Sequence, residues 1–114
     1  GHGAAYDLFL SRTLAHADLI RGPTSAAAVD LFLERALDAA AGVRQPLEQI
    51  AKAHPQVRVL ADSFTEIRQA MAVPRERELA AAYVDSFVEE QIRNGFVAKG
   101  LEFSGQRNVQ VPAP

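Results

Sequence analysis

The residues best placed to do chemistry lie at one predicted helix start and at the end of one predicted strand, and their types suggest anion binding. Gly3, Ala4 and Ala5 precede a predicted helix. Their small side chains would let an anion approach the first backbone N–H groups and the positive end of the helix dipole. Arg44 directly follows residues 39–43, which resemble a buried strand, and open α/β sheets bind ligands at the carboxyl ends of their strands. An ordinary helix start and an ordinary surface arginine remain the alternatives.

The other side chains that could do chemistry lack suitable partners. None of the three histidines has a second ligand at metal-binding spacing, and no serine lies in a G-x-S-x-G turn. Asp30 and Glu34 share a helix face, which is more typical of a solvated surface than of an acid–base pair. The sequence also lacks a phosphate-binding loop with its lysine. We therefore predict that the chain is not an enzyme and holds neither metal nor cofactor.

Composition narrows the class of protein. The chain has 114 residues, of which 48% are hydrophobic, and its 12 basic and 14 acidic side chains give a net charge of −2. This balance is typical of a globular domain and argues against a nucleic-acid partner, which would require a basic surface. The absence of cysteine excludes disulfides, thiol catalysis and cysteine-bound zinc.

Hydrophobic periodicity predicts helices alternating with strands. Apolar residues with helical spacing predict five helices, at residues 4–15, from 24 or 25 to about 37, 46–53, 76–93 and 97–103. Short β-rich or small apolar runs predict strands at 18–21, 38–43, 56–60 and 64–73. This order predicts an α/β fold with three layers (αβα), in which helices cover both faces of a mostly parallel sheet. We expect a single lobe over residues 1–104 and a loose tail over 105–114.

The order and spacing of several segments resemble a known family of receptors. Residues 3–10, 29–33 and 37–43, followed by 64–74 and 79–103, resemble the second lobe of bacterial extracellular solute-binding proteins of family 3, the amino-acid-type receptors of ABC importers. The resemblance covers nearly the whole chain from Gly3 to Phe103. It implies one lobe of a type II periplasmic-binding-protein fold, truncated at its N-terminus. The other lobe and an export signal would lie outside this sequence.

The resemblance also implies a site, a partner and a location. A small polar solute, such as an amino acid or an organic acid, would bind at the lobe edge that carries Gly3 and Arg44, in an exported periplasmic protein that delivers it to a membrane permease. Family members usually place Ser or Thr where this chain has Ala4 and Ala5, and aspartate where it has Val43. A cationic amino group at Val43 would therefore lack its carboxylate partner, which favours an anionic or uncharged organic solute.

Two other functions remain open from the sequence. A lobe without its first strand would expose a sheet edge, and such edges recruit other chains, so the protein could be a self-associating homodimeric interaction module with no role in transport. Some relatives of these receptors resemble cyclohexadienyl dehydratases, but the sequence offers no credible acid–base pair for that reaction.

Overall fold

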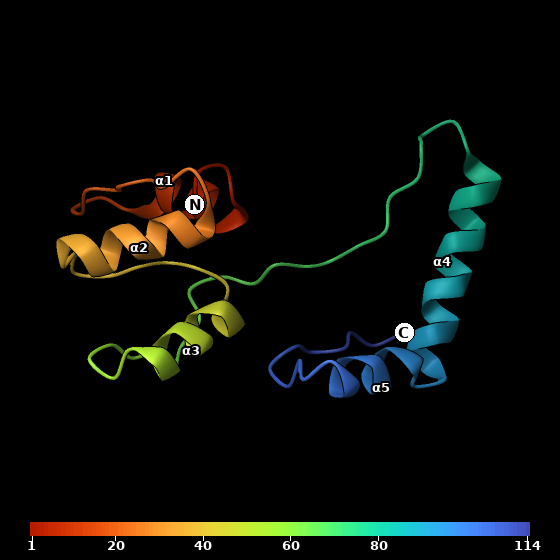
Figure 1. The fold of residues 1–114 in the computed structure, drawn as a ribbon. Coiled ribbons are helices and arrows are strands. Elements are labelled where there is room, and N and C mark those ends of the chain that lie inside the picture. The colour runs from red at the N-terminus through yellow and green to blue at the C-terminus, as the bar shows by residue number, and fades with distance from the viewer. The chain divides into compact units, whose positions relative to one another are not determined.

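The computed structural model describes all 114 residues and contains five helices and no β-strand. The chain divides into two compact units, Gly1–Ile67 and Arg68–Pro114, and each is described by itself (Figure 1). The first unit contains α1 (Ala5–Thr13), α2 (Ser25–Arg35) and α3 (Arg44–Ala53), and the second contains α4 (Glu78–Arg93) and α5 (Phe96–Phe103).

The predicted α/β fold is wrong, because the expected strands do not form a sheet. Residues 18–21, 38–43, 56–60 and 64–73 contain no strand. A strand is defined by backbone hydrogen bonds to a neighbouring strand. The one backbone hydrogen bond that joins distant segments runs from the N–H of His2 to the carbonyl of Gly22, at 2.9 Å. The three-layer αβα arrangement and the truncated type II periplasmic-binding-protein fold are therefore corrected to a helical chain with extended connections.

The helices form close to where the sequence predicts them, because their start and stop signals are local. The Oγ1 of Thr24 accepts a hydrogen bond from the N–H of Ala27 at 3.1 Å, which caps the start of α2. At the other end of the chain, Gly95 adopts a left-handed φ of 80° between α4 and α5. The Oδ1 of Asn94 accepts from the N–H of Phe96 at 2.9 Å, which helps α5 begin.

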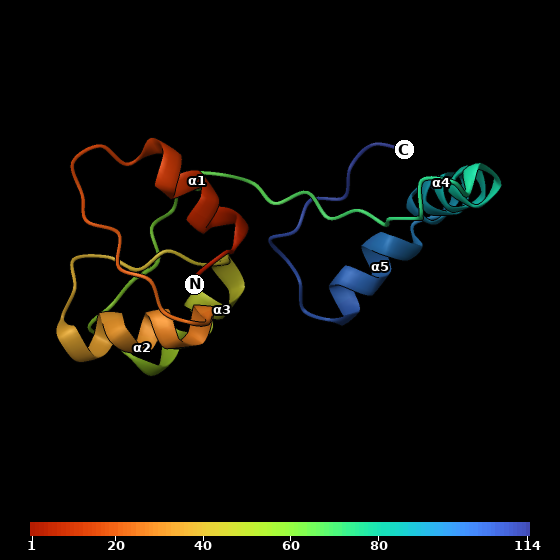
Figure 2. The ribbon, with the colours of Figure 1, turned by 90° about the horizontal axis from the view of Figure 1, so that it is seen from above.

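The first unit has a very small core. Tyr6 of α1 and Val29 of α2 are its buried hydrophobic side chains, and Gly22 is buried as well. The backbones of α1, α2 and α3 do not approach one another closely, and the hydroxyl groups of Tyr6 and Ser25 form the hydrogen bond between α1 and α2. In Figure 1 the extended chain of residues 36–43 passes below α2 and above α3, and Figure 2 shows α1 and α2 apart, as seen from above. The unit is therefore held together largely by contacts between helices and extended chain.

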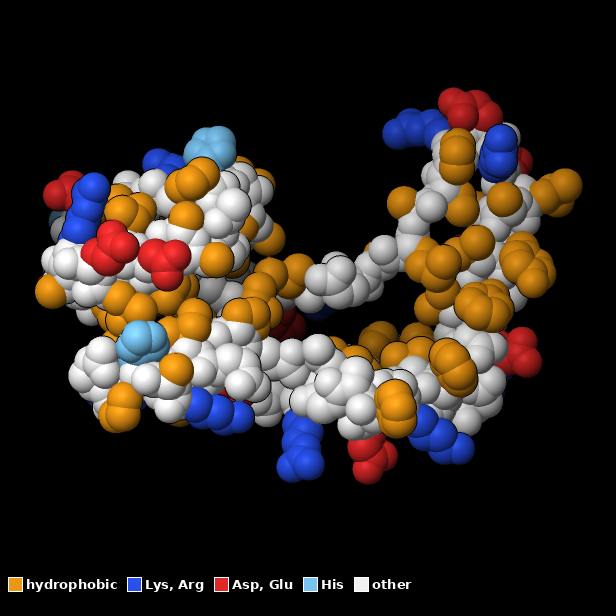
Figure 3. Space-filling model, viewed as in Figure 1, with side chains coloured by type: hydrophobic (Ala, Val, Ile, Leu, Met, Phe, Trp, Pro, Cys, Tyr) orange, Lys and Arg blue, Asp and Glu red, His pale blue; other side chains and the backbone are white.

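The second unit is a pair of helices with apolar side chains on two faces. α4 packs against α5, and Ala80, Val84 and Val88 lie on the partly covered face of α4. Other large apolar side chains of this unit remain exposed, and Figure 3 shows hydrophobic groups on both sides of α4.

No helix in the chain has the length and apolarity that a bilayer crossing requires.

Candidate anion-binding site

The start of α1 leaves backbone donors without partners. Ala4 is the N-terminal flanking residue of α1, and its methyl side chain accepts no hydrogen bond from the first turn. The N–H groups of Ala5, Tyr6 and Asp7 therefore have no partner in the chain. Gly3 and Ala5 are exposed, and Gly3 adopts a φ of 75°, in the left-handed region that favours glycine. These donors form the kind of helix end to which anions bind.

Asp7 holds this helix start in place. Its Oδ2 accepts a hydrogen bond from the N–H of Gly3 at 2.8 Å, so the first turn of α1 reaches back to the residue before Ala4. Its Oδ1 accepts from Nε of Arg21, also at 2.8 Å. Nη2 of Arg21 in turn donates to Oγ of Ser11 at 2.6 Å, and that hydroxyl donates to the carbonyl of Asp7 at 2.7 Å. The four residues Gly3, Asp7, Ser11 and Arg21 form one network.

The charge of Asp7 is stabilised within this network. The hydrogen bond from the Gly3 N–H makes the largest contribution and lowers the pKa of the Asp7 carboxyl below its ordinary value. Burial of Asp7 opposes this effect, and the guanidinium of Arg21 and the hydroxyl of Ser11 add to it. Because Arg21 balances the carboxylate, the helix start does not carry an unpaired negative charge that would repel an anion.

A second contact fixes the position of α1 against α2. The hydroxyl groups of Tyr6 and Ser25 form a close hydrogen bond across 19 residues of sequence. Tyr6 is buried, and Ser25 is the first residue of α2. This contact and the His2–Gly22 backbone bond bring the beginnings of α1 and α2 into one region of the first unit.

The structure gives Arg44 a different role from the one its sequence position predicts. Arg44 is the first residue of α3, and it does not follow a strand. Its Nη1 donates to the carbonyl of Leu60 at 3.1 Å, and its Nη2 donates to the carbonyl of Ala61 at 2.9 Å and to Oγ of Ser63 at 3.4 Å. The guanidinium thus ties the start of α3 to the chain that follows the helix.

Val43 is exposed and precedes α3 without a side-chain cap, so the expected buried strand end is wrong here as well. The structure does not join the two parts of the predicted site. No hydrogen bond or ion pair connects Gly3, Ala4 or Ala5 with Val43 or Arg44, and the backbones of α1 and α3 do not approach each other closely. Gly3–Ala5 remains the candidate site by itself.

The sequence pattern did not predict the network around Asp7. Asp7 and Ser11 stand four residues apart in a predicted helix, so their shared face could have been found from spacing. Arg21 could not have been found in this way, because it lies in a separate segment that only the tertiary structure brings to α1. The residue that balances charge at the helix start is therefore Arg21 and not Arg44.

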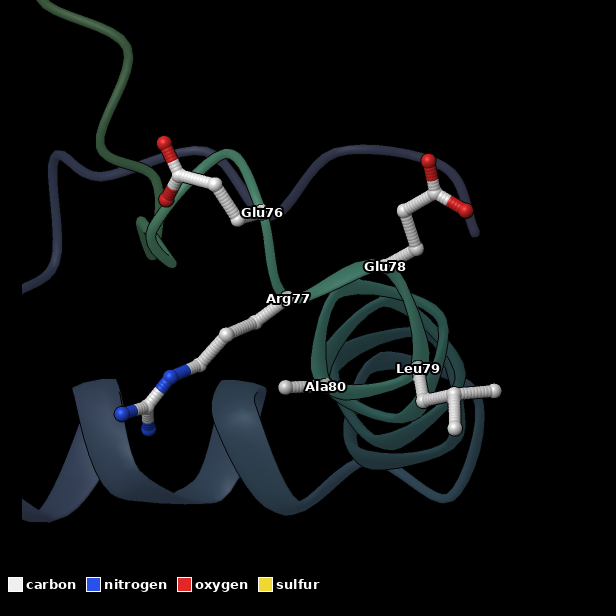
Figure 4. Close-up of a pocket in the computed structure, with 5 residues that line it drawn as sticks. All are labelled: Glu76, Arg77, Glu78, Leu79 and Ala80. Carbon is white, nitrogen blue, oxygen red and sulfur yellow. The ribbon is translucent and has the colours of Figure 1, made fainter.

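The start of α4 also lacks a side-chain cap, so open backbone donors are not confined to α1. A hollow at the beginning of α4 is lined by Glu76, Arg77, Glu78, Leu79 and Ala80. These residues are consecutive in sequence and their side chains point in different directions, as Figure 4 shows, so they do not converge on a ligand. No group of three or more His, Cys, Asp or Glu side chains could hold a metal ion.

The chain was compared with family models, curated proteins and solved structures. No family model, no curated protein and no solved structure matches the chain.

Proposed function

We propose that this chain binds a small anionic organic solute at the start of α1, as part of a solute-binding component of an ABC importer. The observation that carries the binding proposal is the group of unpartnered N–H donors at Ala5, Tyr6 and Asp7, next to the small residues Gly3 and Ala4. A carboxylate is the ligand group that such donors and the helix dipole favour.

Two features of the site support an organic acid over an amino acid. The site has no free carboxylate to hold an ammonium group, because both oxygens of Asp7 already accept hydrogen bonds from Gly3 and Arg21. Ala4 and Ala5 offer no hydroxyl, so the backbone supplies the donors. The ligand would be bound and released without chemical change.

The importer part of the proposal rests on the sequence resemblance to the family 3 receptors alone, because the structure lacks the sheet that their fold requires. In that role the protein is exported to the periplasm and passes its solute to a membrane permease. The alternative interaction module was expected to use an open sheet edge, and the chain has no strand to provide one.

An N-cap substitution tests the binding site. Ala4→Asp places a carboxylate where it can accept from the first turn of α1, so it should occupy the donors and abolish binding of acetate, succinate or citrate, measured by calorimetry. Ala26→Asp is the matched control, because it adds the same charge to the first turn of α2. Equal binding by both variants, or no binding of any acid by the unchanged chain, would refute the site.

The full reading frame tests the importer role separately. We expect an upstream coding region that contains an export signal. A reading frame without this signal would remove the receptor proposal, whatever the chain binds.

A further inference from the structure

The segment of residues 65–73 spans the border between the two units and forms neither helix nor strand (green in Figure 1). No backbone or side-chain group in it takes part in a hydrogen bond or ion pair. Its residues are exposed apart from Thr65 and Val73, which are half-buried. Even the large side chains of Ile67 and Met71 are 44% and 64% exposed. The backbone of this segment is therefore open to another molecule.

A chain segment with these properties is a suitable substrate for an endoprotease. Such an enzyme holds several residues on both sides of the cleaved bond in an extended form and pairs their backbone groups with its own. Exposed loops are accordingly the preferred places of proteolytic cleavage. A helix must open before it can be bound in this way, whereas a segment without hydrogen bonds needs no such local unfolding.

Arg68 gives this segment a residue that a protease can select. Its side chain is exposed, and the three residues before it and the five after it belong to the same segment. A trypsin-like serine protease binds a basic side chain before the cleaved bond in a pocket that contains a carboxylate. The residue after Arg68 is Gln69, which has the backbone N–H that proline would lack.

Most of the other basic residues lie in structured parts of the chain. Six of the 12 are in helices, namely Arg12, Arg35, Arg44, Lys52, Arg93 and Lys99. Arg21 forms an ion pair with Asp7. Arg58 lies in extended chain, but the carbonyls two and three residues after it accept hydrogen bonds from Arg44.

The remaining three arginines lie in or beside turns. The N–H of Arg77 donates to the carbonyl of Pro74 at 3.0 Å, so Arg75 is inside the turn that leads into α4. A glutamate follows each of these two arginines. The N–H of Arg107 donates to the carbonyl of Gly105, also at 3.0 Å. Extended chain without hydrogen bonds thus surrounds none of the other basic residues.

We propose that the peptide bond between Arg68 and Gln69 is a processing site for a trypsin-like serine protease. Water is the second reactant. The C–N bond breaks, the hydroxyl of water becomes part of the new carboxyl group of Arg68, and its hydrogen goes to the new amino group of Gln69. The proposal uses no residue of the candidate anion site, so it is independent of the proposed function.

Cleavage at this bond would leave the contacts within each unit intact. The rings of Phe9 and Phe64, with centroids 5.7 Å apart, lie before the bond, as do the hydrogen bonds from Arg44 to Leu60 and Ala61. The packing of α4 against α5 lies after it. The cut would therefore separate the unit that carries the candidate anion site from the helix pair.

Limited digestion of the full chain with trypsin, with mass spectrometry of the products, tests the site. We expect the first cut after Arg68, which gives fragments 1–68 and 69–114. It should be about tenfold or more faster than any other cut, because the other sites must open first. A first cut at another basic residue, or several cuts at similar rates, would overturn the proposal.

Two variants test the role of the bond itself. Arg68→Gln removes the selected side chain and Gln69→Pro removes the N–H after it, so each should slow the first cut about tenfold or more. Arg58→Gln is the matched control, at an exposed arginine that is also outside the helices, and should leave this rate unchanged.

Circular dichroism checks that the variants keep their helices, since Arg68 and Gln69 make no contact that folding requires. An unchanged rate of the first cut in Arg68→Gln or Gln69→Pro would overturn the proposal. So would an equal loss of that cut in Arg58→Gln.

Discussion

Nε of Arg21 donates a hydrogen bond to Oδ1 of Asp7 at 2.8 Å, and this ion pair joins residues 14 positions apart. Asp7 is buried whereas the side chain of Arg21 is 40% exposed, so the pair lies at the edge of the small core formed by Tyr6 and Val29. Because Asp7 also accepts from the N–H of Gly3, one carboxylate links the N-terminal segment, α1 and the chain before α2. The stability of the first unit should therefore depend on the charge of Asp7.

The first prediction concerns acid. The pKa of Asp7 is lowered in the folded chain, so the unfolded state takes up a proton first as pH falls. The stabilisation is fully present above the ordinary value of 3.8 and is lost as pH falls from there through the pKa of the folded state. Chemical denaturation between pH 7 and pH 3 should show this loss for the unchanged chain.

Asp7→Asn provides the comparison. This variant should be less stable already at pH 7 and should lose less stability on acidification, because the carboxylate is absent. Asp30→Asn is the control, since Asp30 is exposed on α2 and makes no ion pair. If the free energy of unfolding depended on pH in the same way for Asp7→Asn and Asp30→Asn, the network of Gly3, Asp7, Ser11 and Arg21 would not stabilise the fold through the charge of Asp7.

The second prediction concerns the close approach at Gly22. A Cβ at this position would lie 2.5 Å from the backbone N of Ala28, and backbone at the first turns of α2 cannot move aside without disturbing the helix. We expect Gly22→Ala to lower the free energy of unfolding by about 1–3 kcal/mol. Denaturant melts measure the change.

Gly100→Ala is the opposite case and serves as the control. Gly100 lies inside α5, and apart from the backbone of its own helix a Cβ there would meet no atom within 4 Å. Alanine should therefore stabilise the helix by about 0.5–1 kcal/mol. A neutral result for Gly22→Ala beside a stabilising Gly100→Ala would contradict the close packing of Gly22 against α2.

The third prediction concerns the guanidinium of Arg44. Its two terminal nitrogens reach the carbonyls of Leu60 and Ala61 together, which the single ammonium of lysine cannot reproduce. Arg44→Lys should lower the free energy of unfolding by about 1 kcal/mol. Arg58→Lys, at an exposed arginine outside any helix, should change it by less than about 0.5 kcal/mol. Equal changes in the free energy of unfolding for the two variants would show that the hydrogen bonds from Arg44 to Leu60 and Ala61 are not stabilising.

The helices could be predicted from the sequence because their signals are local. Thr24 supplies an N-cap, Asn94 and Gly95 supply a stop, and the apolar spacing of α1 and α2 identifies Tyr6 and Val29 as inward-facing. The strands could not be predicted in this way, because a strand exists only through hydrogen bonds to a partner. The short run 38–43 has the composition of a buried strand and finds no such partner.

The candidate site could be predicted only where it depends on local sequence. The open start of α1 follows from the small residues Gly3, Ala4 and Ala5 and needs no tertiary information. The placement of Arg44 beside it depended on a parallel sheet, so it failed together with the sheet. Arg21 reaches α1 through a connection that has no periodic pattern, and only the structure reveals it.

The fourth prediction compares the starts of α1 and α2. Thr24 caps α2 through the N–H of Ala27, whereas Ala4 leaves the equivalent N–H of α1, that of Asp7, open. Thr24→Ala should therefore lower the free energy of unfolding by about 1 kcal/mol and speed hydrogen exchange at Ala27. Thr24→Ser keeps the accepting oxygen and should restore slow exchange.

The same exchange measurement separates a cap from a ligand site. In the unchanged chain, added succinate should slow exchange at the amides of Ala5, Tyr6 and Asp7, where the donors are open, and leave Ala27 unaffected, where Thr24 already accepts. Slowing at both helix starts would mean that the acid acts through general stabilisation of the chain. The difference between a capped and an uncapped helix start is thus the physical basis on which binding at α1 can be told from nonspecific anion effects.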